Sequence, residues 1–176
     1  MWPPHPGNIL TNLCAAALFT ALAVKKGHLV IYGLAISKAL EYEHAVTPEE
    51  IDGLGHVNNQ VYLHWFMDAA TRHSLAVGWD IKKLIAIGEG WVVRRHEIDY
   101  LLPVLPGETV RIRTWVETAE RATSERQYEI LRGTDGKKVC EGRTMWVWIN
   151  YKTGRPARIP QAVINDFVKW EPAAMK

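Results

Sequence analysis

The most informative part of the sequence reads Asp52-Gly53-Leu54-Gly55-His56-Val57-Asn58-Asn59, and a long helical pattern follows it. Its two glycines favour a turn, because glycine adopts backbone angles that other residues resist. Its two asparagines have side chains that commonly cap the start of a helix. The segment therefore predicts a carboxylate, Asp52, in a turn that leads directly into a helix N-terminus.

This arrangement has two interpretations. The start of a helix offers backbone N–H groups without intrahelical partners, together with the positive end of the helix dipole. A carbonyl oxygen held there is polarised, and a neighbouring carboxylate can attack the carbonyl carbon or deprotonate a water molecule. Alternatively, Asp52 only caps the turn and the asparagines only cap the helix. The local sequence leaves both interpretations open.

The helix is predicted from about residue 60 to residue 77, with Gly78 ending it in a left-handed conformation. Its polar residues fall at offsets of four, seven and eight, so they form one narrow stripe: His64, Asp68, Thr71 and Arg72. The remaining positions of its first turns are mainly apolar, so the helix must be covered on several sides. A curved sheet wrapped around the helix provides such cover.

Strand patterns surround this helix. A short strand is predicted at residues 42–46, and four more follow the helix at residues 91–102, 109–117, 126–132 and 138–151. The turns between them are short, Asp135-Gly136 among them, which favours an antiparallel meander. Pro160 is suited to the first turn of a closing helix that runs to about Trp170. Together these patterns predict an α+β fold that encloses the long helix.

The regular patterns begin at residue 39, so we expect residues 1–38 to lie outside the domain formed by residues 39–176. The run Ile9–Val24 is apolar and is followed by Lys25 and Lys26. It is shorter than the about 20 residues of a spanning helix, and no Lys or Arg precedes it as in a secretory signal. Three interpretations stay open: membrane association through residues 9–26, a cleaved leader, or a weakly packed extension, which we favour.

Composition excludes several functional classes. The 176 residues suffice for one domain, and a net charge of +2 gives no broad basic surface, so no nucleic-acid partner is expected. Cys14 and Cys140 have no metal-ligand spacing, and neither do the seven histidines, so no metal is predicted. Two reduced thiols in a cytoplasmic protein is the simplest interpretation of the cysteines.

The aspartate segment, with Tyr62-Leu63 and Trp65 after it, resembles the aspartate-loop motif of the 4-hydroxybenzoyl-CoA thioesterase and acyl-CoA thioesterase group of hotdog proteins. The resemblance covers about Ala39 to Trp170, and it includes three further segments: Arg94-Arg95-His96-Glu97-Ile98-Asp99-Tyr100, Pro106-Gly107 and Thr153-Gly154-Arg155-Pro156. It implies a hotdog fold, in which a long central helix is wrapped by a curved antiparallel sheet of about five strands. It also implies a homodimer or homotetramer with active sites between subunits.

For activity, the resemblance implies hydrolysis of an acyl-CoA thioester without a cofactor. Asp52 matches the catalytic Asp, acting as nucleophile or as general base, and the backbone N–H of Asn59 matches the group that receives the thioester oxygen. Glu50 stands where the family often has another Asp. The residues between them are expected to shape the substrate loop: Gly55, His56, Val57 and Asn58.

Other residues have alternative interpretations. Arg94 and Arg95 could contact the phosphates of coenzyme A or form an exposed strand face. Asp68 on the helix is a second candidate for the reacting acid. Three tryptophans could line an acyl pocket or pack in the core: Trp65, Trp79 and Trp91.

Three other functions compete with an acyl-CoA thioesterase. Two stay open, a thioesterase acting on an acyl carrier protein and a non-catalytic acyl-CoA-binding protein. A hotdog hydratase is disfavoured, because Asp52 and His56 are four residues apart and no Asn-Pro lies between them.

Overall fold

The computed structural model describes residues 21–25, 28–32 and 35–172, and the chain forms two compact units, residues 1–34 and residues 35–176. In the first unit, strands β1 (Ala21–Lys25) and β2 (His28–Tyr32) pair antiparallel. Of the apolar run predicted at residues 9–24, only residues 21–24 lie within the described residues, and they belong to β1. No helix in the described part of the chain is both long enough and apolar enough to cross a bilayer.

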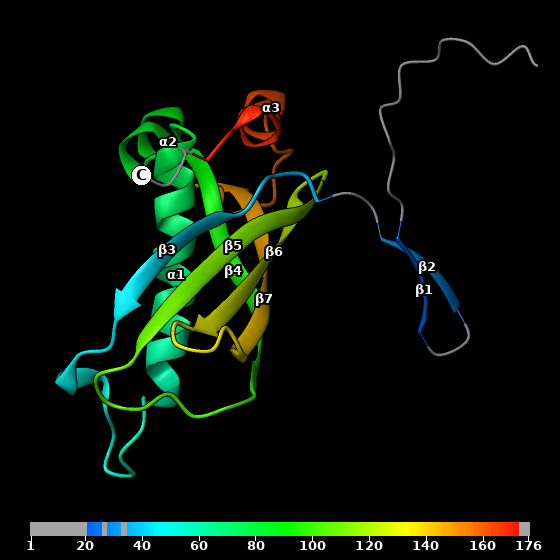
Figure 1. Ribbon diagram of the computed structural model, residues 1–176. Helices are drawn as coiled ribbons and strands as arrows, with labels where there is room; N and C mark the ends of the chain where they lie inside the picture. Colours follow the sequence, from blue (N-terminus) through cyan, green and yellow to red (C-terminus); the bar gives the residue numbers. More distant parts are fainter. Residues whose placement is uncertain (1–20, 26–27, 33–34, 173–176) are drawn as a thin grey trace, which may run out of the picture. The chain divides into compact units, whose positions relative to one another are not determined.

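The second unit consists of one sheet and a long helix with two short helices at one end (Figure 1). The elements in chain order are β3 (Leu40–Ala45), the 3-10 turn η1 (Pro48–Glu50), α1 (Asn59–Ala76), α2 (Ile81–Ile87), β4 (Glu89–Tyr100), β5 (Thr109–Glu120), β6 (Thr123–Arg132), β7 (Lys138–Asn150) and α3 (Gln161–Lys169). The five strands are arranged in the order β3-β5-β6-β7-β4, and all neighbours are antiparallel. The predicted α+β fold is confirmed.

The prediction of a simple meander is wrong at one connection. Strands β5, β6 and β7 follow one another as neighbours, but β4 pairs with β7, with Trp91 opposite Trp148. The backbone N–H groups of Leu101 and Leu102 both donate to the carbonyl oxygen of Val139, so the chain crosses the end of β7 before β5 begins. Strand β4 therefore lies at an edge of the sheet, with one side free of strand partners among the described residues.

Helix α1 packs one face against the sheet. The side chain of Asn58 caps its first turn by accepting a hydrogen bond from the backbone N–H of Gln60 at 2.9 Å. The buried face consists of Tyr62, Trp65, Phe66, Ala69, Ala70 and His73. Phe66 stacks on Tyr128 of β6 with ring centroids 4.4 Å apart. Strand β7 has Gly142 at this point, because a Cβ atom there would lie 2.6 Å from the Phe66 ring.

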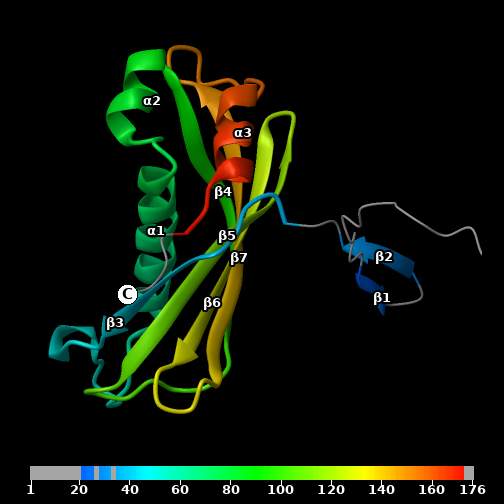
Figure 2. The same ribbon diagram turned by 45° about the horizontal axis from the view of Figure 1, so that its top comes forward.

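A second apolar cluster closes the C-terminal end of α1. It consists of Trp79, Leu84, Val116, Trp148, Ile159, Val163 and Phe167. Helices α2 and α3, which contribute Leu84, Val163 and Phe167, both lie at this end of the domain (Figure 2). Helix α2 was not predicted, because its seven residues provide too short a pattern to separate a helix from a loop. The structure shows that Asp80 caps it through the backbone N–H of Lys83, at 2.8 Å, and that Gly88 ends it with φ of 72°.

The packed chain extends slightly upstream of residue 39. Ser37 is buried and exchanges two hydrogen bonds with Val116 of β5, at 2.9 Å through its hydroxyl and 3.2 Å through its backbone N–H. Ile36 packs against the second cluster. The predicted boundary between residues 38 and 39 stays a prediction, and any shortened chain made to test it should retain residues from Ala35 onward.

The core contains an unexpected titratable residue, His73, which is fully buried on α1. Its Nδ1 atom lies 3.0 Å from Nη1 of Arg126, which is also buried, and its Nε2 has no hydrogen-bond partner within the described residues. Burial, together with the positive charge of Arg126, lowers the pKa of His73 to about 3. His73 is therefore neutral at neutral pH, and its Nδ1 accepts the hydrogen bond from Arg126.

This pKa predicts that stability depends on pH in a defined window. In the unfolded chain His73 titrates near its ordinary pKa of about 6.5, so between about pH 6.5 and pH 3 the unfolded chain binds a proton that the folded chain does not. The free energy of unfolding should therefore fall with decreasing pH, by up to about 1.4 kcal/mol per pH unit. We expect His73→Gln to remove this dependence between pH 7 and pH 5, measured by urea denaturation. His64→Gln, at an exposed position, should leave this dependence unchanged. An unchanged slope of the free energy of unfolding against pH in His73→Gln would contradict the low pKa of His73.

Candidate active site

The aspartate loop is held in shape mainly by its own backbone. The N–H of Asp52 donates to the carbonyl oxygen of His56 at 2.9 Å, and the N–H of Gly55 donates back to the carbonyl oxygen of Asp52 at 3.0 Å. Gly55 has φ of 82°, in the left-handed region, but Gly53 does not. Only one of the two glycines is therefore required by the turn conformation, which corrects the expectation that both are.

The Asp52 carboxylate is partly buried, with 23% of its side chain exposed. One oxygen, Oδ1, accepts a hydrogen bond from the backbone N–H of Leu54 at 2.8 Å. The other, Oδ2, lies 3.6 Å from Nδ1 of His56, which is beyond hydrogen-bond distance. The loop thus fixes the orientation of the carboxylate through one oxygen and leaves the second oxygen available to a substrate or a water molecule.

The loop leads directly into the first turn of α1. Gln60 and Val61 direct their backbone N–H groups to Asn58, the first to its side chain and the second to its carbonyl oxygen. The N–H of Asn59, the first residue of the helix, has no acceptor among the residues that the structure describes. An unpaired N–H at the positive end of an 18-residue helix is suited to receive a carbonyl oxygen or an oxyanion.

Asp52 and Asn59 line the same cleft, which has a volume of about 490 Å³. His56, Val57 and Leu54 of the loop line it too, together with the C-terminal end of β4 and the residues after it: Tyr100, Leu101, Leu102 and Pro103. Most of these apolar side chains are exposed at the rim, Leu54 most of all. The cleft therefore combines a carboxylate, a free helix N-terminus and an apolar rim.

Two tyrosines in the cleft were not predicted as site residues, although both lie in the segments that carry the family resemblance. Tyr100 donates its hydroxyl hydrogen to the carbonyl oxygen of Asn59 at 3.0 Å, and its ring packs edge-on against Tyr62 at 5.3 Å. Burial raises the pKa of Tyr62 to about 12, so its hydroxyl stays protonated at neutral pH. Tyr100 thus connects β4 to the first turn of α1, beside the Asn59 amide.

Glu50 anchors the loop to the rest of the domain. Its carboxylate accepts hydrogen bonds from Nε1 of Trp65 at 2.8 Å and from the backbone N–H of Thr47 at 2.9 Å, and it lies 2.9 Å from Nε2 of His44. Burial raises the pKa of Glu50, but these hydrogen bonds outweigh burial and hold the pKa below its ordinary value. Glu50 therefore connects β3, η1 and α1 around the loop, which explains why an acidic residue stands at this position.

The remaining sequence candidates lie elsewhere. Arg95 is on the other face of the sheet from α1, ion-paired with Glu97, and neither Arg94 nor Arg95 lines the cleft. Asp68 accepts hydrogen bonds from Tyr42 at 2.9 Å and from Arg72 at 2.7 Å, and it does not line the cleft. A role for the two arginines with coenzyme A stays a prediction.

The tryptophans divide between two places. Trp65 packs in the core beside His44 and Tyr62, with its indole N–H bonded to Glu50. Trp79 and Trp91 line a second cavity at the opposite end of α1. Within residues 35–172, no three His, Cys, Asp or Glu side chains are grouped in a way that could hold a metal ion. Cys140 is a buried free thiol, and Cys14 lies outside the described residues.

Comparison with known proteins connects this geometry to a family. Over 136 residues the chain is 24% identical to a chloroplast acyl-acyl carrier protein thioesterase of Arabidopsis thaliana, a match that covers 77% of the chain and 71% of the relative. Among solved structures it resembles a DHNA-CoA thioesterase from Staphylococcus aureus, with a TM-score of 0.63 and 25% identity, covering 68% of this chain and 80% of that one.

The fold is also that of a 1,4-dihydroxy-2-naphthoyl-CoA thioesterase from Synechocystis. The TM-score is 0.70 and the identity 19%, and the match covers 75% of this chain and 97% of the other. These proteins have the hotdog fold implied by the aspartate motif. Residues 46–167 match the family model of the thioesterase-like superfamily, which spans both the aspartate loop and the sheet. The chain belongs to the thioesterase-like superfamily.

Proposed function

We propose that this protein hydrolyses acyl thioesters of coenzyme A, with Asp52 as the reacting carboxylate and the Asn59 backbone N–H as the group that polarises the thioester carbonyl. The observation that carries the proposal is that these two groups line one cleft, and that neither is fully engaged by the rest of the protein. Membership of the thioesterase-like superfamily supports the reaction class.

The chemistry follows from the two groups. The thioester oxygen accepts a hydrogen bond from the Asn59 N–H, which stabilises the negative charge that develops when the carbonyl carbon is attacked. Asp52 takes a proton from a water molecule, and the resulting hydroxide adds to the carbonyl carbon to form a tetrahedral intermediate. The carbon–sulfur bond then breaks, the proton on Asp52 passes to the departing thiolate, and the products are a carboxylic acid and a thiol.

A nucleophilic route uses the same residues. Asp52 adds to the carbonyl carbon directly, the thiolate leaves, and the mixed anhydride formed on Asp52 is hydrolysed by water in a second step. The Leu54 N–H bond to Oδ1 supports both routes, because it orients the carboxylate and leaves Oδ2 free. The two routes differ in where the water oxygen is incorporated.

The rim of the cleft supports an apolar acyl group. Leu54, Tyr100, Leu101 and Leu102 are exposed around Asp52, and exposed apolar side chains grouped around a polar centre are typical of a binding surface. Coenzyme A and acyl carrier protein present the same thioester group, so the choice between these carriers depends on contacts outside the cleft. Neither Arg94 nor Arg95 lines the cleft of the single chain. We therefore propose them as contacts for the phosphates of coenzyme A only in an assembly with a second copy.

We also propose that the protein is a homo-oligomer that pairs through β4. This strand has twelve residues, lies at the end of the sheet order, and exposes Val92 and Val93. A long edge strand with apolar side chains favours pairing with another strand. Because the C-terminal end of β4 lines the cleft, a partner paired there would lie close to the site.

A panel of thioesters tests this function. Octanoyl, palmitoyl and benzoyl groups would each be supplied on coenzyme A and on acyl carrier protein, and release of free thiol would be followed in a sample whose mass is measured by light scattering. We expect kcat/KM of at least about 10⁴ M⁻¹ s⁻¹ for one coenzyme A ester, in a dimer or tetramer.

The other outcomes are equally specific. Turnover of carrier-protein esters alone would replace the proposed substrate with acyl carrier protein, the carrier named for the Arabidopsis relative. Binding of every ester with no turnover would favour a non-catalytic acyl-CoA-binding protein. An active monomer would refute the proposed pairing of β4.

A further inference from the structure

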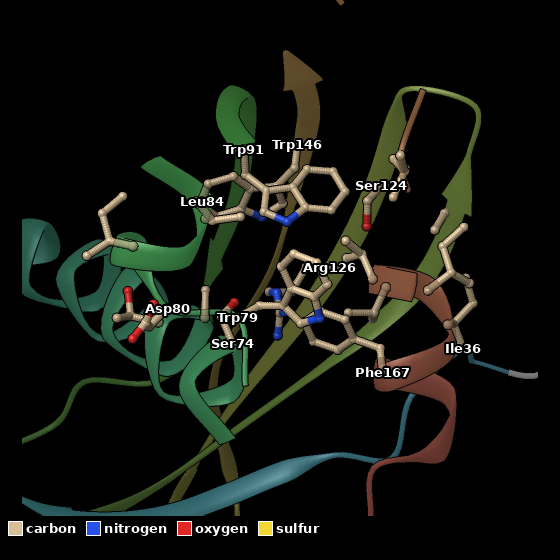
Figure 3. Close-up of a pocket in the computed structure, with 18 residues that line it drawn as sticks. Ile36, Ser74, Trp79, Asp80, Leu84, Trp91, Ser124, Arg126, Trp146 and Phe167 are labelled. Carbon is tan, nitrogen blue, oxygen red and sulfur yellow. The ribbon is translucent and has the colours of Figure 1, made fainter. Parts of the chain in front are cut away.

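A second cavity lies at the C-terminal end of α1, with a volume of about 210 Å³. Its walls are mostly apolar and aromatic, and Figure 3 shows Trp91 and Trp146 together on one side with Trp79 and Phe167 on the other. None of its lining residues lines the aspartate cleft. The cavity reaches α1 at Ala70, Thr71 and Ser74, so 11 residues or more separate it from Asn59 along the helix, about 17 Å at 1.5 Å per residue.

Two charged side chains line this apolar space, Asp80 and Arg126 (Figure 3). Asp80 accepts the hydrogen bond from the Lys83 backbone N–H that caps α2, at 2.8 Å. Arg126 of β6 is only 5% exposed, and within residues 35–172 no Asp or Glu carboxylate forms an ion pair with it. Its Nη1 atom contacts Nδ1 of His73 at 3.0 Å and the hydroxyl of Thr114 at 3.3 Å. Both of these bonds come from Nη1, and Nε and Nη2 make no hydrogen bond with a described residue. The guanidinium therefore has neutral partners on one side and the cavity on the other.

Such a residue is costly for stability. A guanidinium removed from water without a carboxylate partner loses its hydration, and the Phe167 ring, whose centroid lies 5.6 Å from Cζ of Arg126, offsets only part of that cost. An apolar residue of similar size would therefore be expected to stabilise the domain. Burial also lowers the pKa of Arg126, because removal from water disfavours the charged form of the guanidinium. His73 cannot compensate, because it is neutral and contributes only an acceptor. An anion in the cavity would supply the missing partner.

We propose that this cavity is a second binding site, for a monocarboxylate with an apolar body, whose carboxylate pairs with Arg126. A planar guanidinium binds a carboxylate through two parallel hydrogen bonds, and the two free nitrogens of Arg126 are the donors for them. The aromatic walls bind the body of the ligand. The volume sets its size, because a cavity of about 150 Å³ accommodates benzene and this one is larger. A two-ring aromatic acid or an eight-carbon fatty acid is of suitable size.

The ligand has two possible sources that share this chemistry. One is the acid released by the thioesterase reaction proposed above, and the other is an acid formed elsewhere. The binding site itself does not depend on hydrolysis, because its residues and those of the aspartate cleft are separate sets.

Calorimetry on the full-length protein tests the site with 2-naphthoate and octanoate as ligands. We expect at least one to bind, and 2-naphthalenemethanol or octanol, which keep the body and lack the charge, to bind at least about tenfold more weakly. Arg126→Met should remove the preference for the acid over the alcohol, and it should not lower the melting temperature of the free protein. Ser74→Phe, which fills the cavity and keeps Arg126, should abolish binding of both acid and alcohol.

Matched controls separate this site from the other. Arg158→Met removes an exposed arginine that lines neither cavity and should leave acid binding unchanged. Asp52→Asn should also bind the acid, so loss of hydrolysis and loss of this site are distinguishable. Comparing the affinities of different acids distinguishes the two sources. Tightest binding by the acid that the preferred thioester releases indicates the reaction product, and tighter binding by an unrelated acid indicates an acid formed elsewhere.

Three results would overturn the proposal. One is the absence of binding by either acid at millimolar concentration, and another is unchanged acid preference in Arg126→Met. The third is competition between the acid and a thioester that persists in Ser74→Phe, which would place the acid in the aspartate cleft instead.

Discussion

Replacing Asp52 with Asn is expected to lower kcat for the preferred thioester by at least about a hundredfold, the usual scale for the loss of a general base or nucleophile. Asn retains the shape of the side chain and its carbonyl oxygen can still accept the hydrogen bond from Leu54, so the loop should keep its conformation. It loses the charge and basicity that the reaction needs. Steady-state release of free thiol measures the effect, and KM should change much less than kcat.

The matched variant is Asp68→Asn, which tests the other carboxylate considered from the sequence. Asp68 is hydrogen-bonded to Tyr42 and Arg72 and does not line the cleft, so we expect its replacement to leave kcat within a fewfold of the parent. Near-normal turnover in a folded Asp52→Asn protein, with a large loss in Asp68→Asn, would exchange the two roles. Equal small losses in both would contradict carboxylate catalysis.

The two routes through Asp52 can also be separated. In a single turnover in H₂¹⁸O, general-base catalysis incorporates one labelled oxygen into every molecule of product acid. Attack by Asp52 followed by hydrolysis of the anhydride at the Asp52 carbonyl instead incorporates the label into the protein and leaves the first product unlabelled. Mass spectrometry of the acid and of the peptide that contains Asp52 measures both.

The second large effect is expected for Phe66→Ala, which should lower the free energy of unfolding by about 3–5 kcal/mol. Phe66 is fully buried, stacks on Tyr128 and lies against the backbone of β7 at Gly142, so its removal leaves a cavity between α1 and the sheet. Domains of this size are stable by about 5–15 kcal/mol, so this change is a large part of the total. Urea denaturation of both proteins at one pH measures it.

Leu75→Ala on the same helix is the control. Leu75 is 54% exposed, so its truncation should change stability by about 0.5 kcal/mol or less. A loss in Phe66→Ala no larger than that would show that the stacked pair contributes little to the attachment of α1. A change in the slope of unfolding against urea would show instead that the native or unfolded state had changed in compactness.

Local sequence was enough to predict the part of the site that is contiguous in the chain. The Asp52–Asn59 segment contains its own turn, its own cap and the start of α1, and each of these depends on hydrogen bonds between residues a few positions apart. The predicted bounds of α1 and of the strands were also close to the observed bounds, because the periodicity of apolar side chains indicates which face of an element is buried. The edge position of β4 was not predictable in this way, because short connections do not specify which strand is the neighbour.

Only the tertiary structure decided the contacts between residues that are far apart in the chain. Tyr100 reaches the carbonyl oxygen of Asn59 across 41 positions, and Arg126 reaches His73 across 53. In the sequence, Arg126 lies in an alternating strand and His73 directly follows the polar residues Thr71 and Arg72 of the helix, so neither is distinguishable from a solvent-exposed residue. The register of β6 and the rotation of α1 bring both inside. Periodicity determines which residues are buried together on one element, but only the packing of elements determines which buried charge lacks a partner.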